Sequence, residues 1–267
     1  MTSKIKRTWV LCATLAVAGV FALSGCSATA PAQTTSSDEP AAMSSSPEAG
    51  SADEKMRDFV TAVYANTFTT TEEMVSPGSA AAKYVIHQKS TDTALKANGD
   101  YTEPGTADQP TLEFKDGTAT AKYSDGTSFT WSEFEYDDDG LVVSWTTPSG
   151  KLPSLLWSTD FSGAIAGNTV ALTSAYKTNS GEMRALLTVT AGGEGIDFMM
   201  PYQAQFVASD GIAYAAQSFS APRQSLPAGV TGYVVLAFPQ VPFGGTIYLE
   251  GYNIGSPDVW KAEIPVS

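Results

Sequence analysis

The sequence predicts an α+β N-terminal domain, in which helices precede an antiparallel meander, followed by an all-β sandwich domain. Two patterns favour this fold class. Between residues 52 and 98, apolar side chains recur at three- and four-residue intervals, which is typical of one face of a helix. From residue 112 onward, apolar and polar residues alternate and Asp-Gly pairs separate several runs, which is typical of strands joined by hairpins.

Residues 1–25 are organised as a signal peptide. Three basic residues precede an apolar run over residues 9–23. This run is shorter than the roughly 20 residues that a membrane-spanning helix needs. The run ends in the tetrapeptide Leu-Ser-Gly-Cys, whose last residue is Cys26. This tetrapeptide resembles the lipobox of bacterial lipoproteins. The resemblance implies cleavage before Cys26 and attachment of a diacylglyceryl group to this cysteine.

The predicted modification places the protein on the extracytoplasmic face of the cell membrane. A diacylglyceryl cysteine carries two acyl chains, and two chains are enough for stable anchoring. Residues 26–51 begin with this cysteine, are rich in Ser, Thr, Ala and Pro, and contain no aromatic residue. Because such a composition cannot bury a core, we expect this segment to be a disordered tether.

Charge and residue usage exclude several classes of partner and cofactor. The chain has 15 Lys and Arg against 28 Asp and Glu, a net charge of −13, and loss of the three basic residues of the signal peptide would leave 12 against 28, or −16. This balance argues against binding to nucleic acid. The two cysteines are Cys12, in the removed segment, and the lipidated Cys26. With one histidine and no free thiol, we expect no disulfide, no metal site and no cofactor.

The helix-plus-sheet domain is predicted over residues 52–150. Ser51 and Glu54 fit a capping box, which predicts a helix over about residues 52–66. A second helix is predicted to start at Ser76-Pro77, with Tyr84 and Val85 facing inward. Residues 90–98 are predicted to add a short third helix that ends at Gly99.

The meander is predicted from alternating runs between residues 112 and 145. Asp-Gly pairs at residues 116–117, 125–126 and 139–140 mark the turns, because glycine accepts a positive φ without penalty. In the third strand, the apolar phase moves between residues 131 and 134, which predicts a bulge near Ser132–Glu133.

The sandwich is predicted over residues 165–267, after a connection over residues 150–168 that contains proline and glycines. Seven runs alternate; in the first, Val170, Leu172 and Tyr176 are expected on one face. The segments 206–214, 226–229 and 232–239, with a final strand around Trp260, resemble the immunoglobulin-like domain of unassigned function found in bacterial lipoproteins. A secreted mycobacterial immunoprotective antigen has a similar sandwich. This resemblance implies a fold and no activity.

Residues 52–148 faintly resemble the cone-shaped domains of the nuclear-transport-factor-like superfamily. The motif Asp-Gly-Leu-Val-Val-Ser-Trp over residues 139–145 is similar to a strand common in them. Because members of this superfamily often enclose an apolar pocket, the resemblance implies a small-ligand cavity. The alternative, which we favour from the sequence, is a filled core.

The residues that carry chemistry form no recognisable catalytic motif. The one mature histidine, His87, is expected to be a half-exposed helix residue. The acidic cluster over residues 133–139 is interpreted as a solvated hairpin tip, since a calcium loop would place Thr146 where a bidentate acid is needed. Three aromatic residues outside the clean alternation, Trp157, Phe161 and Tyr202, are candidates for an inter-domain groove.

Export and lipidation without catalytic equipment predict a non-enzymatic binding module for an envelope or extracellular ligand, which is a protein, a glycan or a small molecule. One alternative is a carboxylate-based hydrolase of cell-wall glycans, which needs two acids across a cleft. The other alternative is a carrier that holds a small apolar ligand in the N-terminal domain. Among these candidates, the only functional residue that the sequence assigns is Cys26.

Overall fold

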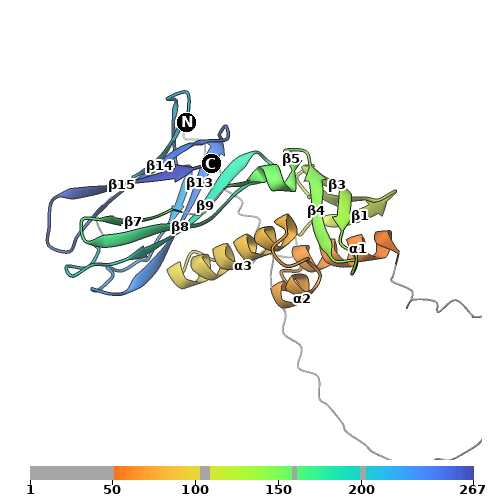
Figure 1. The fold of residues 1–267 in the computed structure, drawn as a ribbon, viewed down its shortest axis with the longest axis horizontal. Coiled ribbons are helices and arrows are strands. Elements are labelled where there is room, and N and C mark those ends of the chain that lie inside the picture. The colour runs from red at the N-terminus through yellow and green to blue at the C-terminus, as the bar shows by residue number, and fades with distance from the viewer. Residues whose placement is uncertain (1–50, 103–108, 158–160, 199–202) are drawn as a thin grey trace, which may run out of the picture.

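A computed structural model describes residues 51–102, 109–157, 161–198 and 203–267. Within these ranges the protein is mostly antiparallel β-structure with a small helical part (Figure 1). The signal peptide, Cys26 and the tether lie outside the described residues, so lipidation stays a prediction. Among the residues that the structure describes, no helix is both long enough and apolar enough to cross a membrane.

The helical part consists of α1 (Ala52–Tyr64), α2 (Phe68–Glu73) and α3 (Ala80–Asn98). Ser51 caps α1 as predicted, because its Oγ accepts the Glu54 N–H at 3.3 Å. The short helix α2 was not predicted. The predicted second and third helices are one continuous helix, which ends at Gly99 with a φ of 72°. The predicted start at Ser76-Pro77 was wrong, because the Ser79 side chain caps the helix by accepting the Ala82 N–H.

Helix α3 was predicted in two pieces because its buried side changes along its length. Tyr84 and Val85 pack into the core of the helix-plus-sheet region, as predicted. Ala94 and Leu95 pack instead with Leu186 and Val235 of the following β-region. Because α3 packs against two regions, its apolar residues do not form a single stripe along the helix. The helical periodicity of the sequence is therefore weak over the full length of α3.

The first sheet has the strand order β1-β2-β3-β4-β5 and is antiparallel throughout. The predicted bulge is confirmed: the register of β3 against β4 shifts after Ser132, and Glu133 has a φ of 51°. The glycines of the three Asp-Gly turns all have positive φ values. The strands are β1 (Thr111–Lys115), β2 (Thr118–Lys122), β3 (Ser128–Tyr136), β4 (Val142–Thr147) and β5 (Gly150–Lys151).

The described part of the predicted connection over residues 150–168 is built from regular elements. It contains β5, the 3₁₀ helix η2 (Leu152–Leu155), β6 (Leu156–Trp157) and β7 (Ser162–Ile165). Leu152 and Leu155 are fully buried in the core beneath the first sheet. The segment therefore belongs to the packed structure.

The C-terminal region is formed by two antiparallel sheets that enclose one core. One sheet has the order β11-β10-β14-β15; the other has the order β12-β13-β9-β8-β6, with β7 also paired to β8. Fully buried side chains such as Phe206 and Phe238 come from opposite sheets and pack at 6.0 Å between ring centroids. The strands are β8 (Asn168–Lys177), β9 (Glu182–Thr190), β10 (Ala204–Ala208), β11 (Ala213–Ala215), β12 (Ser218–Ser220), β13 (Thr231–Gln240), β14 (Gly245–Tyr252) and β15 (Val259–Val266).

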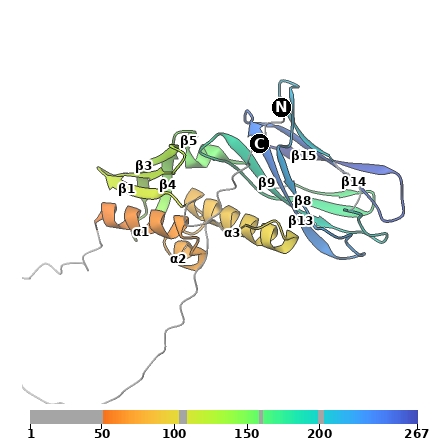
Figure 2. The same cartoon turned by 180° about the vertical axis from the view of Figure 1, so that it is seen from behind.

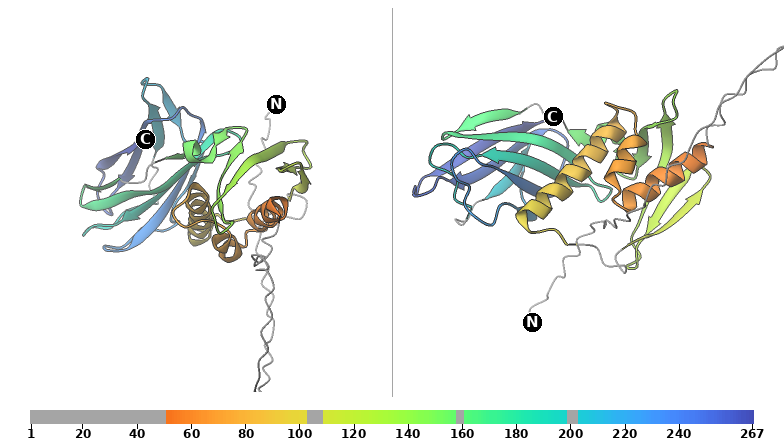
Figure 3. Two further views of the ribbon diagram at one scale, coloured as in Figure 1. Left: turned by 45° about the vertical axis from the view of Figure 1, so that its right-hand side comes forward. Right: turned by 90° about the horizontal axis from the view of Figure 1, so that it is seen from below.

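Helix α3 joins the two regions by lying across the outer face of the β13-β9-β8 sheet (Figures 2 and 3). At its C-terminal end, Asn98 Nδ2 donates hydrogen bonds to Ser220 Oγ and to the Tyr233 carbonyl oxygen, both at 3.0 Å. Arg223 lies just beyond and pairs with Asp100 at 2.9 Å. Polar contacts therefore fix the end of the helix on a sheet that is distant in sequence.

A bulge in β8 turns part of this sheet toward the helices. The register of β8 against β9 shifts between Leu172 and Ser174. Before the shift, Val170 and Leu172 face the sandwich core; after it, Tyr176 belongs to the core of the helix-plus-sheet region. The prediction that these three residues share one face was therefore wrong, because one inserted residue reverses the side-chain alternation.

Candidate functional site

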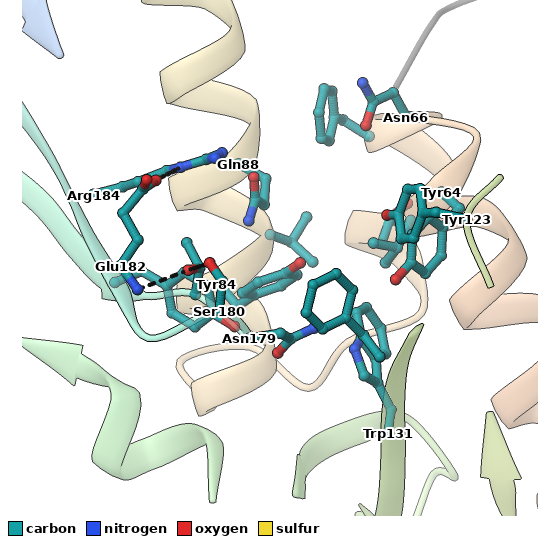
Figure 4. A pocket seen from close by; sticks show the side chains of 17 residues that line it. Tyr64, Asn66, Tyr84, Gln88, Tyr123, Trp131, Asn179, Ser180, Glu182 and Arg184 are labelled. Atoms are coloured by element: carbon teal, nitrogen blue, oxygen red, sulfur yellow. Dashed lines mark hydrogen bonds and ion pairs between the residues drawn. The ribbon is translucent and has the colours of Figure 1, made fainter. Parts of the chain in front are cut away.

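A cavity of about 350 Å³ lies where the helices, the first sheet and the β8–β9 hairpin meet (Figure 4). The helices contribute the end of α1, the start of α2 and the middle of α3. The first sheet contributes the β2–β3 hairpin, and the sandwich contributes the end of β8 and the start of β9. The volume lies within the range of small-ligand sites, near its lower end.

Aromatic side chains form much of the lining. Tyr84 on α3 lies at the centre, with its ring centroid 6.2 Å from that of Trp131 and 5.0 Å from that of Tyr176. Tyr64 from α1 approaches Trp131 at 5.6 Å. The β2–β3 hairpin adds Tyr123 and a phenylalanine, Phe129. These rings come from four separate elements, so the folding of both regions is needed to assemble them.

Polar groups line the side of the cavity opposite Tyr64 and Tyr123 (Figure 4). Arg184 Nε donates to Glu182 Oε1 at 2.9 Å, and both side chains are about one-third exposed or less. The Gln88 side-chain amide also lines this side of the cavity. The Asn179 Oδ1 atom is buried and lacks a partner within the described part of the chain.

The β8–β9 hairpin that carries Asn179 is held in place by several hydrogen bonds. Ser149 Oγ donates to the carbonyl oxygens of Thr178 and Asn179, at 3.0 and 3.1 Å. Thr178 Oγ1 accepts the Glu182 N–H at 3.1 Å. Gly181 turns the chain with a φ of 81°. The polar wall of the cavity is therefore preorganised by hydrogen bonds within the hairpin and by those from Ser149, which lies outside the lining.

Tyr176 and Arg184 are cross-strand neighbours, which explains the electrostatics of this wall. Burial raises the pKa of the Tyr176 hydroxyl above its ordinary value of 10.0, and the positive charge of Arg184 partly opposes the increase. The phenol is therefore neutral throughout the physiological range and can both donate and accept a hydrogen bond.

His87 lies behind the cavity, and the expectation of half exposure was wrong. Its side chain packs between α3 and β8 with a relative exposure of 1%, and its Nδ1 lies 2.8 Å from Ser174 Oγ. Burial, with a smaller contribution from the Arg184 charge, lowers the pKa of His87 from 6.5 to about 3. The imidazole is therefore neutral and has a packing role, which the sequence could not show because the partner strand is distant in the chain.

The acidic cluster of residues 133–139 is used for local structure. Glu133 Oε2 accepts the Thr146 hydroxyl at 2.6 Å, and Glu135 pairs with Lys151 at 2.7 Å. Asp137 Oδ1 accepts the Leu141 N–H at 2.8 Å, and hydrogen bonds led by that from the Ser76 side chain lower its pKa. Within the described residues, no group of three or more His, Cys, Asp or Glu side chains is placed to hold a metal ion.

The aromatic residues proposed for a groove lie elsewhere. Trp157 is buried in the sandwich core and stacks on Phe243 at 4.4 Å, and Phe161 packs against the same core. Tyr202 lies outside the described residues. The cavity described above does lie between the two regions, but none of these three residues is among its described lining residues. The lining residues were missed because a β-bulge and an unpredicted hairpin contact bring them together.

Comparison of the chain with models of protein families, with curated proteins and with solved structures gives no match.

Proposed function

We propose that this protein is a lipid-anchored, extracytoplasmic binding protein that holds a small ligand in the cavity between α3, the β2–β3 hairpin and the β8–β9 hairpin. The observation that carries the proposal is the cavity itself, with aromatic rings on one side and polar groups on the other, among them the unpaired Asn179 Oδ1. Its placement outside the membrane rests on the signal-peptide pattern that ends at Cys26.

The immunoglobulin-like character of the C-terminal region is part of the same proposal. Two antiparallel sheets around one core support it, as do the motifs around residues 206–214 and 232–239. In this arrangement, the sandwich supplies one wall of the cavity and a rigid support for α3.

Binding is favoured over hydrolysis by the acids available at the site. Glycoside hydrolysis by a carboxylate pair needs two acids that face each other across the substrate. The lining contains one carboxylate among the described residues, Glu182, and this carboxylate is already paired with Arg184.

The ligand-binding part is tested by filling the cavity. Val63→Trp places a large side chain in the lining on α1, whereas Ile86→Trp on the exposed side of α3 is the matched control. Native mass spectrometry of the full chain should find a co-purifying small molecule with the wild type and with Ile86→Trp, and none with Val63→Trp. Equal occupancy in all three proteins would refute a ligand in this cavity.

Anchoring is tested separately. Metabolic labelling with a clickable fatty acid should modify the wild-type protein, while Cys26→Ala should remain unlabelled and unprocessed. Labelling that persists in Cys26→Ala would contradict attachment at this residue.

A further inference from the structure

We infer that the ligand of this cavity is a neutral saccharide of about one or two rings. This inference rests on the proposed function and adds the chemical class of the ligand. It is carried by three features of the lining taken together: partly exposed aromatic rings, polar side chains that both donate and accept hydrogen bonds, and a pair of opposite charges that neutralise each other.

The aromatic wall suits a ligand with flat apolar faces. Sugar rings expose C–H groups on one or both faces, and these pack against the faces of aromatic side chains while the hydroxyls point outward. The partly exposed rings of the lining are those of Tyr64, Tyr123 and Phe129, and the last two lie 5.9 Å apart between centroids. Trp131 and Tyr84 are buried beneath them. Because α1 and the β2–β3 hairpin hold these side chains on regular structure, little ordering is needed when a ligand binds, which lowers the entropic cost of binding.

The opposite wall suits hydroxyl groups. The Gln88 amide and the Arg184 guanidinium line this side, and the buried Asn179 Oδ1 has no hydrogen-bond partner within the described residues. An amide offers both donors and an acceptor, and a hydroxyl can satisfy either. A purely apolar ligand would leave these groups desolvated and unpaired, which is unfavourable. The apolar carrier is therefore disfavoured by this wall.

The charge of the lining selects against an ionised ligand. Arg184 and Glu182 are the charged residues that line the cavity, and they pair with each other at 2.9 Å. An anionic ligand would have to compete with the Glu182 carboxylate for the guanidinium. A cationic ligand would have to displace Arg184. A neutral ligand can accept hydrogen bonds from Arg184 while the ion pair stays intact.

The size of the cavity limits the number of rings. A volume of about 350 Å³ equals the bulk volume of about a dozen water molecules at ~30 Å³ each. This space accommodates a monosaccharide or a compact disaccharide.

The ligand class is tested by isothermal titration and saturation-transfer NMR with the full chain in detergent. The neutral probes are maltose, cellobiose and N,N′-diacetylchitobiose; glucuronate is the anionic probe and 1-hexanol is the apolar probe. Blank micelles correct for partitioning. We expect at least one neutral disaccharide to bind, and to bind more tightly than glucuronate or hexanol.

Variants assign the binding to the cavity. Gln88→Leu should weaken disaccharide binding about tenfold, because one hydrogen-bonding amide is lost. Gln205→Leu, on the exposed side of β10, is the matched control and should bind like the wild type. Glu182→Gln should improve glucuronate binding, because Arg184 is then without its carboxylate partner.

The outcomes separate the ligand class from the proposed function. If no neutral sugar binds but glucuronate or hexanol binds in a way that Val63→Trp abolishes, the saccharide class is wrong and the small-ligand function stands. If no probe binds and native mass spectrometry finds an empty cavity, both are wrong. Sugar binding that Gln88→Leu and Val63→Trp leave unchanged would also overturn the inference.

Discussion

The core of the sandwich and the core of the helix-plus-sheet region are built from different kinds of side chain. In the sandwich core, four of 24 buried apolar residues are aromatic, whereas in the other core the number is five of 15. Aliphatic side chains interdigitate between two regular sheets and fill the space between them. Wide, rigid rings cannot close a neighbouring gap by a small rotamer change. The comparison suggests that the cavity lies beside the aromatic core because packing there is harder to complete.

The largest expected effect is the difference in stability loss between two phenylalanine-to-alanine substitutions, one in each region. Phe206→Ala in the filled sandwich core should lower the free energy of unfolding by roughly 3–5 kcal/mol. Phe129→Ala at the cavity wall should lower it by about 1 kcal/mol, because the side chain is only partly buried. Urea denaturation measures both values. Similar losses for the two variants would remove the contrast between the cores.

The second expected effect is a pH dependence of the free energy of unfolding, which arises from the buried His87 in the helix-plus-sheet region. The unfolded state takes up a proton on His87 below pH 6.5, while the folded state resists protonation until about pH 3. Stability is therefore fully present above pH 6.5 and falls as the pH drops toward 3, by roughly 3 kcal/mol between pH 7 and pH 4. Urea denaturation at several pH values measures this. His87→Gln should have a shallower pH dependence than the wild type, and an unchanged dependence would contradict the assignment.

A third effect concerns the contact between the two regions. Asn98→Ala removes hydrogen bonds to Ser220 and Tyr233 and leaves a part-buried carbonyl group unpaired. We expect a loss of roughly 1–3 kcal/mol in the free energy of unfolding, measured by urea denaturation. Thr93→Ala, on the exposed side of the same helix, should change it by less than about 0.5 kcal/mol. Equal effects would mean that this end of α3 contributes little to the junction.

The smallest effect is expected on the surface. Lys89 pairs with Glu72 at 2.8 Å between α3 and α2, but the two side chains are 46% and 37% exposed. Lys89→Met should therefore change stability by roughly 0–1 kcal/mol, and 1 M NaCl should abolish the difference in thermal unfolding between this variant and the wild type. A larger, salt-insensitive loss would show that this contact has a packing role.

The sequence predicts the regular elements of this fold well. Alternation and Asp-Gly turns locate the strands on both sides of the junction, and the phase change at Glu133 is a real bulge. The predictions were wrong for the two elements, α3 and β8, whose side chains pack into both regions of the molecule. Helix α3 was divided because its partners change, and Tyr176 was assigned to the wrong face because a bulge in β8 leaves no trace in the apolar pattern.

The candidate site could be predicted from the sequence only in outline. A cavity in the N-terminal region was considered from the resemblance to cone-shaped domains, and aromatic residues were expected at a junction. The polar wall of Gln88, Asn179 and Arg184 depends on pairs more than 80 residues apart in the chain. Local pattern carries no information on such contacts. Lipidation of Cys26 lies outside the described residues and stays a prediction.

The sharing of α3 has a consequence for dissection of the molecule. A fragment that starts at residue 165 would lose the helix that covers Leu186 and Val235, and these buried side chains would be exposed to water on an open sheet surface. Such a surface invites self-association. A fragment that ends at residue 150 would lose Tyr176 from its core and one wall of the cavity. Experiments that divide the chain at its apparent boundary would thus study two damaged halves, and each region is best probed by point substitutions in the intact protein.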